Sequence, residues 1–314
     1  MQERYAATLK SIDYLNYFVL WDGKVKRFKQ TTPPHQLREA AMKIRSLMIA
    51  LSFTFLASVA MSAPTACPQH YLGGQAPDFL NEKVSQKTQE VCYSNYALVH
   101  SGITRTSLFS AEHLSKAALI ADHPARKNTF HPDLHIKAPD RAELRDYENS
   151  GYDRGHMAPF ADMTDNKSQQ ESFSLANMVP QNKNNNEHLW KAVEAATRDL
   201  AISSGELYVV TGPIFFGPEL KKLNKRVLVP THIFKAIYDP QQKQAAAYLV
   251  ENTQGVRYAV IPIAQVEQLT GIAVFPTLSD EVKQSPLTLP KPKLGEGAKA
   301  AVEDKTLVPQ KPAP

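Results

Sequence analysis

The chain has 314 residues, of which 43% are hydrophobic and 21% are charged, and this composition excludes a disordered, collagen-like or multi-pass membrane protein. The formal net charge is +5, but residues 1–63 hold nine Lys/Arg against four Asp/Glu, so the rest of the chain has a net charge of zero. The overall basic character is therefore no argument for a nucleic-acid partner. Any phosphate-binding surface has to be a local cluster of Arg and Lys.

A short basic start, an apolar run and small residues follow one another from Met42 to Ala63, which is the layout of a secretory signal peptide. The apolar run is shorter than the roughly 20 residues that span a bilayer, so we predict cleavage near residues 60–63, with an uncleaved membrane anchor as the alternative. Residues 1–41 then form an upstream extension outside the fold, and Met42 is our hypothesis for the true start. This layout predicts an exported protein, periplasmic or secreted, with no stable membrane association after cleavage.

The chain has two cysteines, Cys67 and Cys92, and both follow the predicted cleavage site. In an exported chain they favour a disulfide, which would close a loop worth about 3 kcal/mol of stability. A zinc site is disfavoured because there is no C-x-x-C pair.

One folded domain is expected over residues 64–284, followed by a Pro/Lys-rich tail, residues 285–314, which we predict to be disordered. Strand-like runs occur at residues 93–100, 207–211, 227–230, 232–238, 245–250 and 258–261. Helical patterns occur at residues 111–120, 186–203 and 264–269. Strands in runs with irregularly placed helices indicate an α+β fold.

The chemistry-bearing residues are concentrated in one polar stretch that begins Asp153-Arg154-Gly155-His156. A histidine is the side chain best suited to accept a proton from water near neutral pH, and the planar fork of an arginine suits a phosphate. In an extended segment Arg154 and His156 point to one face. By itself the tetrapeptide fits a solvated turn at least as well.

A second group recurs at a spacing of four: Asn186, Trp190, Glu194 and Arg198. On one helix these residues form a stripe that can face a single groove. An amide oxygen suits a largely hydrated Mg²⁺, which is commonly bound through one or two protein groups. The alternative is that Asn186 caps the helix, that Trp190 packs in the core and that the last two residues form a surface ion pair.

Together these residues resemble the DNA/RNA non-specific endonucleases, a family with a ββα-metal site. The D-R-G-H sequence matches the family's signature, and Asn177-Met-Val-Pro-Gln181 with the stripe that follows matches its N-x-x-P-Q…N…W…E…R block. The resemblance covers most of residues 90–275. It implies an α+β, ββα-metal (His-Me finger) domain with a central, mostly antiparallel sheet and flanking helices.

The resemblance also implies a role for each matching residue. His156 would be the general base and Asn186 the ligand of one Mg²⁺ ion, for which Mn²⁺ could substitute. Arg154 would lie at the scissile phosphate, Glu194 would hold metal-bound water and Asn177 would support the catalytic group. Arg198 would contact phosphate or orient Glu194. The family uses a further upstream arginine, for which Arg126 is the candidate and Lys127 the competitor, and Asp153 is expected to be structural.

The expected activity is Mg²⁺-dependent hydrolysis of DNA and RNA, bound through the phosphate backbone, because no residue of the stretch is placed to read base edges. The alternatives are a nuclease of the same fold restricted to RNA or single-stranded DNA, a catalytically silent nucleic-acid-binding module, and a cell-envelope structural protein tethered by its tail. The resemblance also makes a homodimer an expectation, although no residue in the sequence decides it.

Overall fold

The computed structural model describes residues 16–21, 24–29, 65–295, 297 and 299–309 and divides the chain into two units, Met1–Met61 and Ser62–Pro314. In the first unit, β1 (Asn16–Trp21) and β2 (Lys24–Lys29) form an antiparallel pair within the predicted upstream extension. The predicted signal peptide, residues 42–63, lies outside the described residues. None of the described helices is long and apolar enough to cross a membrane.

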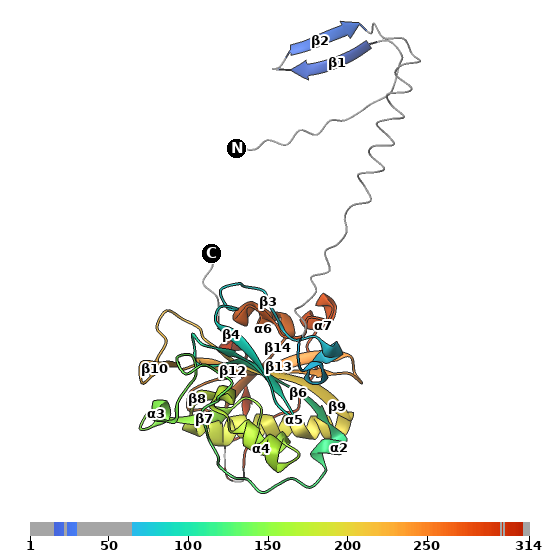
Figure 1. The fold of residues 1–314 in the computed structure, drawn as a ribbon. Helices are drawn as coiled ribbons and strands as arrows, with labels where there is room; N and C mark the ends of the chain where they lie inside the picture. Colours follow the sequence, from blue (N-terminus) through green and yellow to red (C-terminus); the bar gives the residue numbers. More distant parts are fainter. Residues whose placement is uncertain (1–15, 22–23, 30–64, 296, 298, 310–314) are drawn as a thin grey trace. The chain divides into compact units, whose positions relative to one another are not determined.

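An eight-stranded sheet forms the centre of the second unit (Figure 1). All neighbouring strands are antiparallel except the last pair, β14 and β16, which is parallel. The spatial order is β16 (Val302–Glu303), β14 (Arg257–Ile261), β13 (Gln244–Glu251), β12 (His232–Asp239), β9 (Glu206–Ile214), β6 (Thr106–Ser115), β5 (Ala97–Ser101) and β4 (Thr88–Cys92). The expected α+β fold with a central, mostly antiparallel sheet is confirmed.

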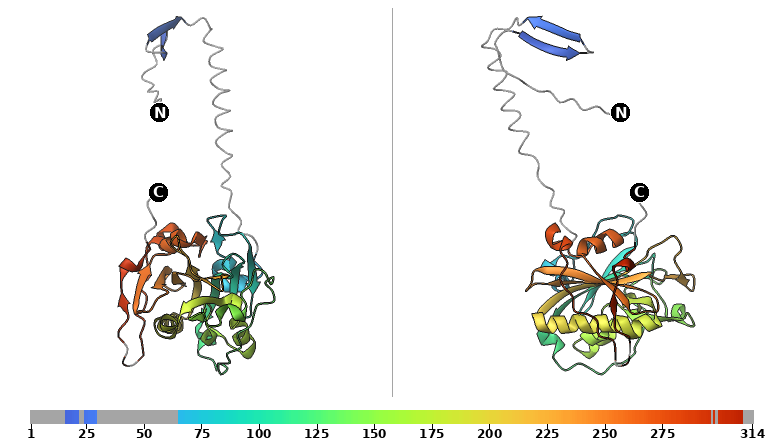
Figure 2. Two further views of the ribbon diagram at one scale, coloured as in Figure 1. Left: turned by 90° about the vertical axis from the view of Figure 1, so that its left-hand side faces the viewer. Right: turned by 180° about the vertical axis from the view of Figure 1, so that it is seen from behind.

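Helices cover both faces of this sheet (Figures 1 and 2). One face carries α2 (Lys116–Leu119), α3 (Leu144–Tyr147), α4 (Asn166–Ser172) and α5 (Lys191–Ser204), and the other carries α6 (Ile263–Thr270) and α7 (Asp280–Gln284). Three two-stranded pairs complete the unit: β3 (Asp78–Phe79) with β15 (Ile272–Ala273), β7 (Tyr152–His156) with β8 (Met178–Asn182), and β10 (Lys222–Leu223) with β11 (Val227–Leu228). Short 3-10 turns lie at Pro68–His70, Leu72–Gly74, Phe160–Asp162, Leu175–Asn177 and Lys305–Leu307.

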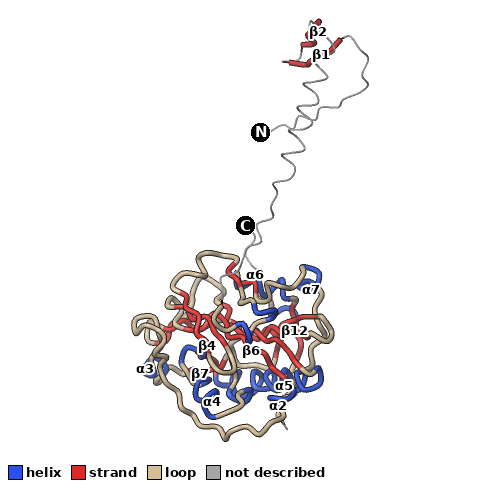
Figure 3. Tube along the Cα trace, turned by 45° about the vertical axis from the view of Figure 1, so that its right-hand side comes forward, coloured by secondary structure: helices blue, strands red, loops and turns tan. Residues whose placement is uncertain are grey.

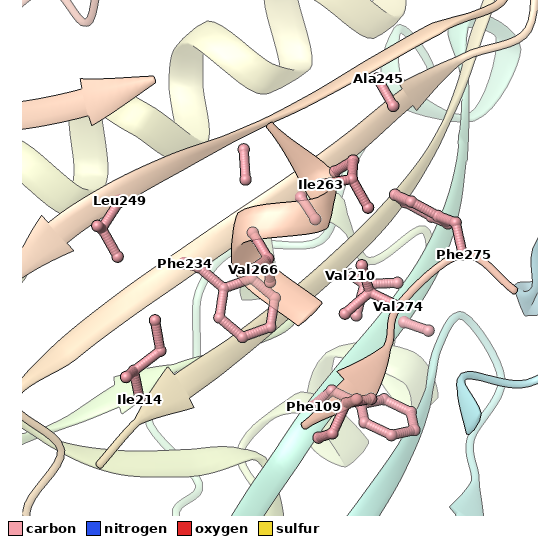
Figure 4. Close-up of a cluster of buried hydrophobic side chains, with 14 of the residues drawn as sticks. Phe109, Val210, Ile214, Phe234, Ala245, Leu249, Ile263, Val266, Val274 and Phe275 are labelled. Carbon is pink, nitrogen blue, oxygen red and sulfur yellow. The ribbon is translucent and has the colours of Figure 1, made fainter. Parts of the chain in front are cut away.

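The α6 face of the sheet is an apolar core (Figure 4). Phe109, Val210 and Phe234 come from neighbouring strands and are at most 3% exposed. Val266 of α6 and Phe275 pack against the same cluster. Because side chains alternate along a strand, the residues between these positions point to the opposite face.

The opposite face packs against α5 through a second cluster. Leu189 and Val193 are buried in the same cluster as the strand residues Val209 and Ile237, and Ala196 of α5 is buried as well. The helix ends at Gly205, which adopts φ 95°, a left-handed value that glycine tolerates without strain. The prediction of a helix over residues 186–203 is confirmed.

The helix predicted over residues 111–120 is wrong for most of its length. These residues belong largely to β6, and only Lys116–Leu119 are helical. Because β6 lies in the middle of the sheet, its side chains are buried on both faces, as residues 109–112 show. Ala, Glu, Leu and Lys are strong helix formers, and here the pairing of β6 with strands on both sides overrides that local preference.

The prediction of a disordered tail over residues 285–314 is also wrong for the described part, which packs onto the domain. Leu287 and Leu289 join the cluster under α5, and Leu307 joins the cluster under α6. Val302–Glu303 pairs with the edge strand β14. These three leucines follow no sustained helix or strand period, so the pattern did not predict their burial.

The predicted disulfide between Cys67 and Cys92 is present, with a Cα–Cα distance of 5.7 Å. It joins the segment before the first 3-10 turn to the end of β4. Glu90 reinforces the same connection by accepting hydrogen bonds from the Thr65 hydroxyl at 2.6 Å and the Tyr71 hydroxyl at 2.9 Å.

Candidate active site

The site is built on a β-ribbon followed by a helix. Strands β7 and β8 pair antiparallel, with His156 opposite Met178 and Arg154 opposite Pro180. The chain then forms a π-helical turn, Asn185–Trp190, which continues into α5. Alternation along β7 places Tyr152, Arg154 and His156 on one face of the ribbon. The ββα arrangement expected from the resemblance is therefore formed by these residues.

His156 lies in a box of aromatic rings. Its ring centroid is 4.9 Å from that of Phe173, 5.8 Å from that of Phe130 and 6.4 Å from that of Phe160. Its Nε2 is buried and has no hydrogen-bond partner. Burial, assisted by the charge of Arg126, lowers the pKa of His156 to about 3. The ring is therefore neutral at pH 7, and one of its two nitrogens can accept a proton.

Two arginines stack on the same rings. The Cζ of Arg154 lies 4.3 Å from the centroid of Phe130, and the Cζ of Arg126 lies 4.3 Å from the centroid of Phe160. Arg126 is carried by the long loop between α2 and α3 (Figure 3) and is exposed, as is its neighbour Lys127. Because Arg126 contacts the rings around His156, it is placed at the site as predicted.

The side chain of Asn186 is oriented by Asp153, whose Oδ2 accepts a hydrogen bond from Asn186 Nδ2 at 3.0 Å. No hydrogen bond to the Oδ1 of Asn186 is made by the described residues. This orientation leaves an amide oxygen available as a ligand, and it gives Asp153 a role in orienting that ligand beyond the structural one expected from the sequence.

Glu194 and Arg198 lie further along α5, on the stripe that the spacing predicts. Burial raises the pKa of Glu194 to about 7, against the opposing charges of Lys235 and Arg198. The Nη1 of Arg198 is 2.9 Å from Asp162 Oδ1, in a salt bridge with a carboxylate that is almost fully buried. Arg198 is thus held by Asp162 beside Glu194. The fourth residue of the stripe, Trp190, is 1% exposed and packs in the core.

Asn177 is not exposed to substrate. It is fully buried, and its amide makes four hydrogen bonds, which fix the chain just after His156. The Oδ1 accepts from the Ser110 hydroxyl and from Ala158 N, and the Nδ2 donates to the carbonyls of Ala158 and Ser172. Asn177 is therefore placed to hold the chain beside His156, with no surface of its own for a substrate.

Gly155 is required by the packing of Gln181 across the ribbon. A Cβ at position 155 would lie 2.7 Å from the Cβ of Gln181, closer than such atoms approach. Gln181 in turn donates to Asn185 Oδ1 at 2.8 Å, which connects the ribbon to the π-helical turn. The turn that carries Asn186 is thereby fixed relative to the strand that carries His156.

Sequence reasoning missed several residues of the site. Asp162 stands in the same polar stretch but matched no element of the signature. Phe160 and Phe173 belong to no element of the signature, and in the structure both contact Arg126 and His156. Glu112 of β6 is buried with neither carboxylate oxygen hydrogen-bonded, and burial raises its pKa well above the usual range. The mistaken helix over residues 111–120 concealed it.

Among the described residues, the one group of three His, Cys, Asp or Glu ligand atoms close enough to share a metal is Cys67, Glu90 and Cys92. Its two sulfur atoms are joined in the disulfide, so it is not a metal site. Among the described residues the ribbon and helix therefore hold no such group of three, and Asn186 Oδ1 is a candidate single ligand.

Comparison with known proteins identifies the family that the sequence motifs resemble. Residues 75–281 match the family model described as DNA/RNA non-specific endonuclease. The mitochondrial nuclease EXOG of Danio rerio is 32% identical over 214 residues, 60% of this chain and 61% of that protein. Mitochondrial endonuclease G of Homo sapiens is 30% identical over 203 residues, 59% of this chain and 68% of that protein. The chain thus spans about three fifths of the EXOG relative.

A solved structure agrees with the fold. A chain from the crystal structure of the EndoG/EndoGI complex superimposes with a TM-score of 0.56 at 26% identity, covering 62% of this chain and 88% of that one. These names also correct one expectation. The sequence predicted a periplasmic or secreted protein, whereas the EXOG and endonuclease G relatives are named as mitochondrial, which contradicts that location. The layout of residues 42–63 was not sufficient to assign a compartment.

Proposed function

We propose that this chain, which belongs to the DNA/RNA non-specific endonuclease family, is a Mg²⁺-dependent endonuclease that hydrolyses phosphodiester bonds in both DNA and RNA. One observation carries the proposal. His156 offers a neutral ring between two arginines that stack on its aromatic box, on the same ribbon as Asp153, which orients the amide of Asn186.

In this proposal His156 is the general base. Its neutral imidazole takes a proton from the water that attacks the phosphorus atom. Arg154 and Arg126 balance the negative charge that grows on the phosphoryl oxygens. Their guanidinium groups are held in place by the phenyl rings beneath them and need little reorganisation when substrate binds.

The residues beside His156 fit a hydrated divalent cation. Asn186 would hold it through Oδ1, and Glu194, which makes no hydrogen bond with the described residues, would accept hydrogen bonds from its hydration shell. When bound, Mg²⁺ or Mn²⁺ supplies the positive charge that stabilises the departing 3′ oxygen. Arg198 keeps Glu194 in position from its salt bridge with Asp162.

The expected substrates are both polymers. The proposed contacts are made to phosphate, which is common to DNA and RNA and carries no sequence information. A nuclease restricted to RNA or single-stranded DNA, and a silent binding module, are the competing functions. A homodimer remains an expectation of the family resemblance.

The test uses the full-length chain with supercoiled plasmid and with structured RNA, each with Mg²⁺ and with EDTA. We expect metal-dependent cleavage of both polymers, with kcat about 10²- to 10⁴-fold lower in His156→Ala. His113→Ala is the matched control, because His113 contacts Glu206 and Tyr208 outside the site. Cleavage of one polymer alone supports the restricted nuclease. Absence of cleavage by folded wild-type protein supports a binding module, and cleavage unaffected by His156→Ala overturns the mechanism.

A further inference from the structure

A lysine-rich hairpin stands beside the ribbon that carries His156. Strands β10 and β11 pair through Leu223 and Val227, and Asn224 and Lys225 in the turn have φ values of 46° and 57°. Two consecutive residues in the left-handed region are typical of the tight turns that match strand twist. Four of the six residues from Lys221 to Arg226 are cationic.

The hairpin is fixed to the domain at its tip. The Nε of Arg226 is 3.1 Å from Oδ1 of Asp146, a carboxylate whose side chain is fully buried, and Asn224 donates to the same oxygen at 3.0 Å. Leu223 and Val227 are buried in a cluster with Tyr147 of α3. A hairpin held by a buried ion pair and an apolar contact presents its remaining side chains from a defined position.

Those remaining side chains are three lysines without counter-ions. Lys221, Lys222 and Lys225 are exposed, and none of them forms a salt bridge with any carboxylate in the described part of the chain. The charge of Arg226 is balanced by Asp146, so the net charge of the hairpin is carried by these lysines. Uncompensated charge on a rigid element is favourable for binding a polyanion.

Lys221 connects this charge to the site. Its Nζ lies 4.7 Å from the ring centroid of Tyr152, the first residue of β7. Tyr152 shares a face with Arg154 and His156, and strand geometry separates successive side chains on that face by about 6.8 Å. A line of groups therefore runs from His156 through Arg154 and Tyr152 to Lys221. Its length is about 14 Å along β7, which exceeds the reach of a single phosphate.

We propose that Lys221, with Lys222 and Lys225, forms a second backbone-phosphate site for nucleic acid, several nucleotides from the scissile bond. This inference rests on the proposed nuclease function and adds a dependence on substrate length. A strand whose reacting phosphate lies at His156 and Arg154 reaches the hairpin only if it continues past Tyr152. Long substrates then gain binding that short ones lack.

The first experiment measures kcat and KM for a long oligonucleotide and for a dinucleotide. In Lys221→Gln we expect the ratio of kcat/KM for the long to the short substrate to fall about two- to fivefold, the range for one exposed ionic contact. In the triple variant Lys221→Gln/Lys222→Gln/Lys225→Gln the fall is on the order of tenfold. The loss appears in KM, because remote phosphate binding is equal in the ground and transition states.

Two matched variants sharpen the result. Lys221→Arg keeps the charge over Tyr152 and is expected to restore the ratio. Lys243→Gln removes the same charge from the turn that follows β12. The hairpin precedes the other end of β12, so this variant is expected to leave the ratio unchanged. An unchanged ratio in the triple variant, or a loss confined to kcat, overturns the proposal.

The second experiment measures binding without cleavage, so that it does not depend on the nuclease function. Fluorescence anisotropy with a labelled long oligonucleotide, in the His156→Ala background, gives log Kd against log salt concentration. We expect the slope to decrease by about one for Lys221→Gln, since one phosphate contact is lost. A slope equal to that of the parent refutes the hairpin site, whereas absence of cleavage in wild-type protein refutes only the nuclease.

Discussion

The two faces of the central sheet are made by the same strands and have opposite character. On β6, Phe109 and Ala111 face the apolar cluster under α6, whereas Ser110 and Glu112 face α5. The α6 face contains closely packed apolar side chains. The α5 face contains buried polar groups with incomplete hydrogen bonding, including Glu112 and the Nε1 of Trp190.

Lys235 shows the same contrast on β12. Its neighbours Phe234 and Ala236 are fully buried in the apolar cluster, while Lys235 is 1% exposed on the α5 face and donates to Thr211 Oγ1 at 2.7 Å. Buried charges of this kind cost stability unless they are paired. They collect on the face where α5 carries Glu194 and Arg198. The comparison teaches that both faces contain an apolar cluster, but only the α5 face also contains the buried charged groups around the site.

The largest expected effect separates stability from activity. Phe234→Ala removes a fully buried ring from the apolar face, and we expect it to lower the free energy of unfolding by about 3–5 kcal/mol. Activity per folded molecule is expected to stay near the wild-type value at temperatures well below the transition. Thermal denaturation and kcat measured together test this. A kcat that falls while the melting temperature is retained would show that the two faces are not independent.

The next effect concerns the orientation of Asn186. In Asp153→Ala the amide of Asn186 loses its acceptor, and we expect the Mg²⁺ concentration for half-maximal activity to rise about 10- to 100-fold. The melting temperature is expected to change little, because Asp153 is only partly buried. Glu187→Ala is the control, since Glu187 is an exposed acid of the same π-helical turn. An equal change in both variants would indicate a general charge effect.

The smallest effect is the pH dependence of Glu194. Burial raises its pKa from 4.5 to about 7, so the folded protein binds more protons than the unfolded chain between these values. The free energy of unfolding of metal-free protein therefore falls as pH rises from about 4.5 to about 7, and is constant above that.

Thermal melts in EDTA at pH 5 and pH 8 measure this difference. Between pH 5 and pH 8 we expect the melting temperature of the wild-type protein to fall a few degrees more than that of Glu194→Gln, because glutamine cannot ionise. Equal losses in the two proteins would place the pKa of Glu194 near its ordinary value. The same ionisation makes the affinity for Mg²⁺ increase with pH through about 7.

The linear parts of the site were predictable, since strand alternation and helical spacing depend only on local sequence. Arg154 with His156, and Asn186 with Glu194, follow directly from those two periods. The contacts that fix them were not predictable. Asp162, Phe130 and Glu112 reach the site from segments that matched no element of the signature, and tertiary packing alone brings them there.

Errors in the fold have a similar origin. The helix predicted over residues 111–120 was wrong because Ala, Glu, Leu and Lys favour helices locally, whereas most of these residues are placed in β6 by tertiary packing. The tail was taken for disordered because prolines and lysines separate its few apolar residues. The choice between Arg126 and Lys127 depended on which side chain turns toward Phe160, and that is a property of the folded loop.

The short strand β16 has a consequence for how copies of the protein associate. An uncovered edge strand offers a row of unpaired peptide groups to any other chain in solution. Val302–Glu303 occupies part of that row on β14, so this segment protects one edge of the sheet against growth by strand addition, while β4 forms the other edge. A dimer is therefore not expected to form by strand pairing at β14. Proteolytic loss of the C-terminal segment would open the edge to intermolecular strand pairing.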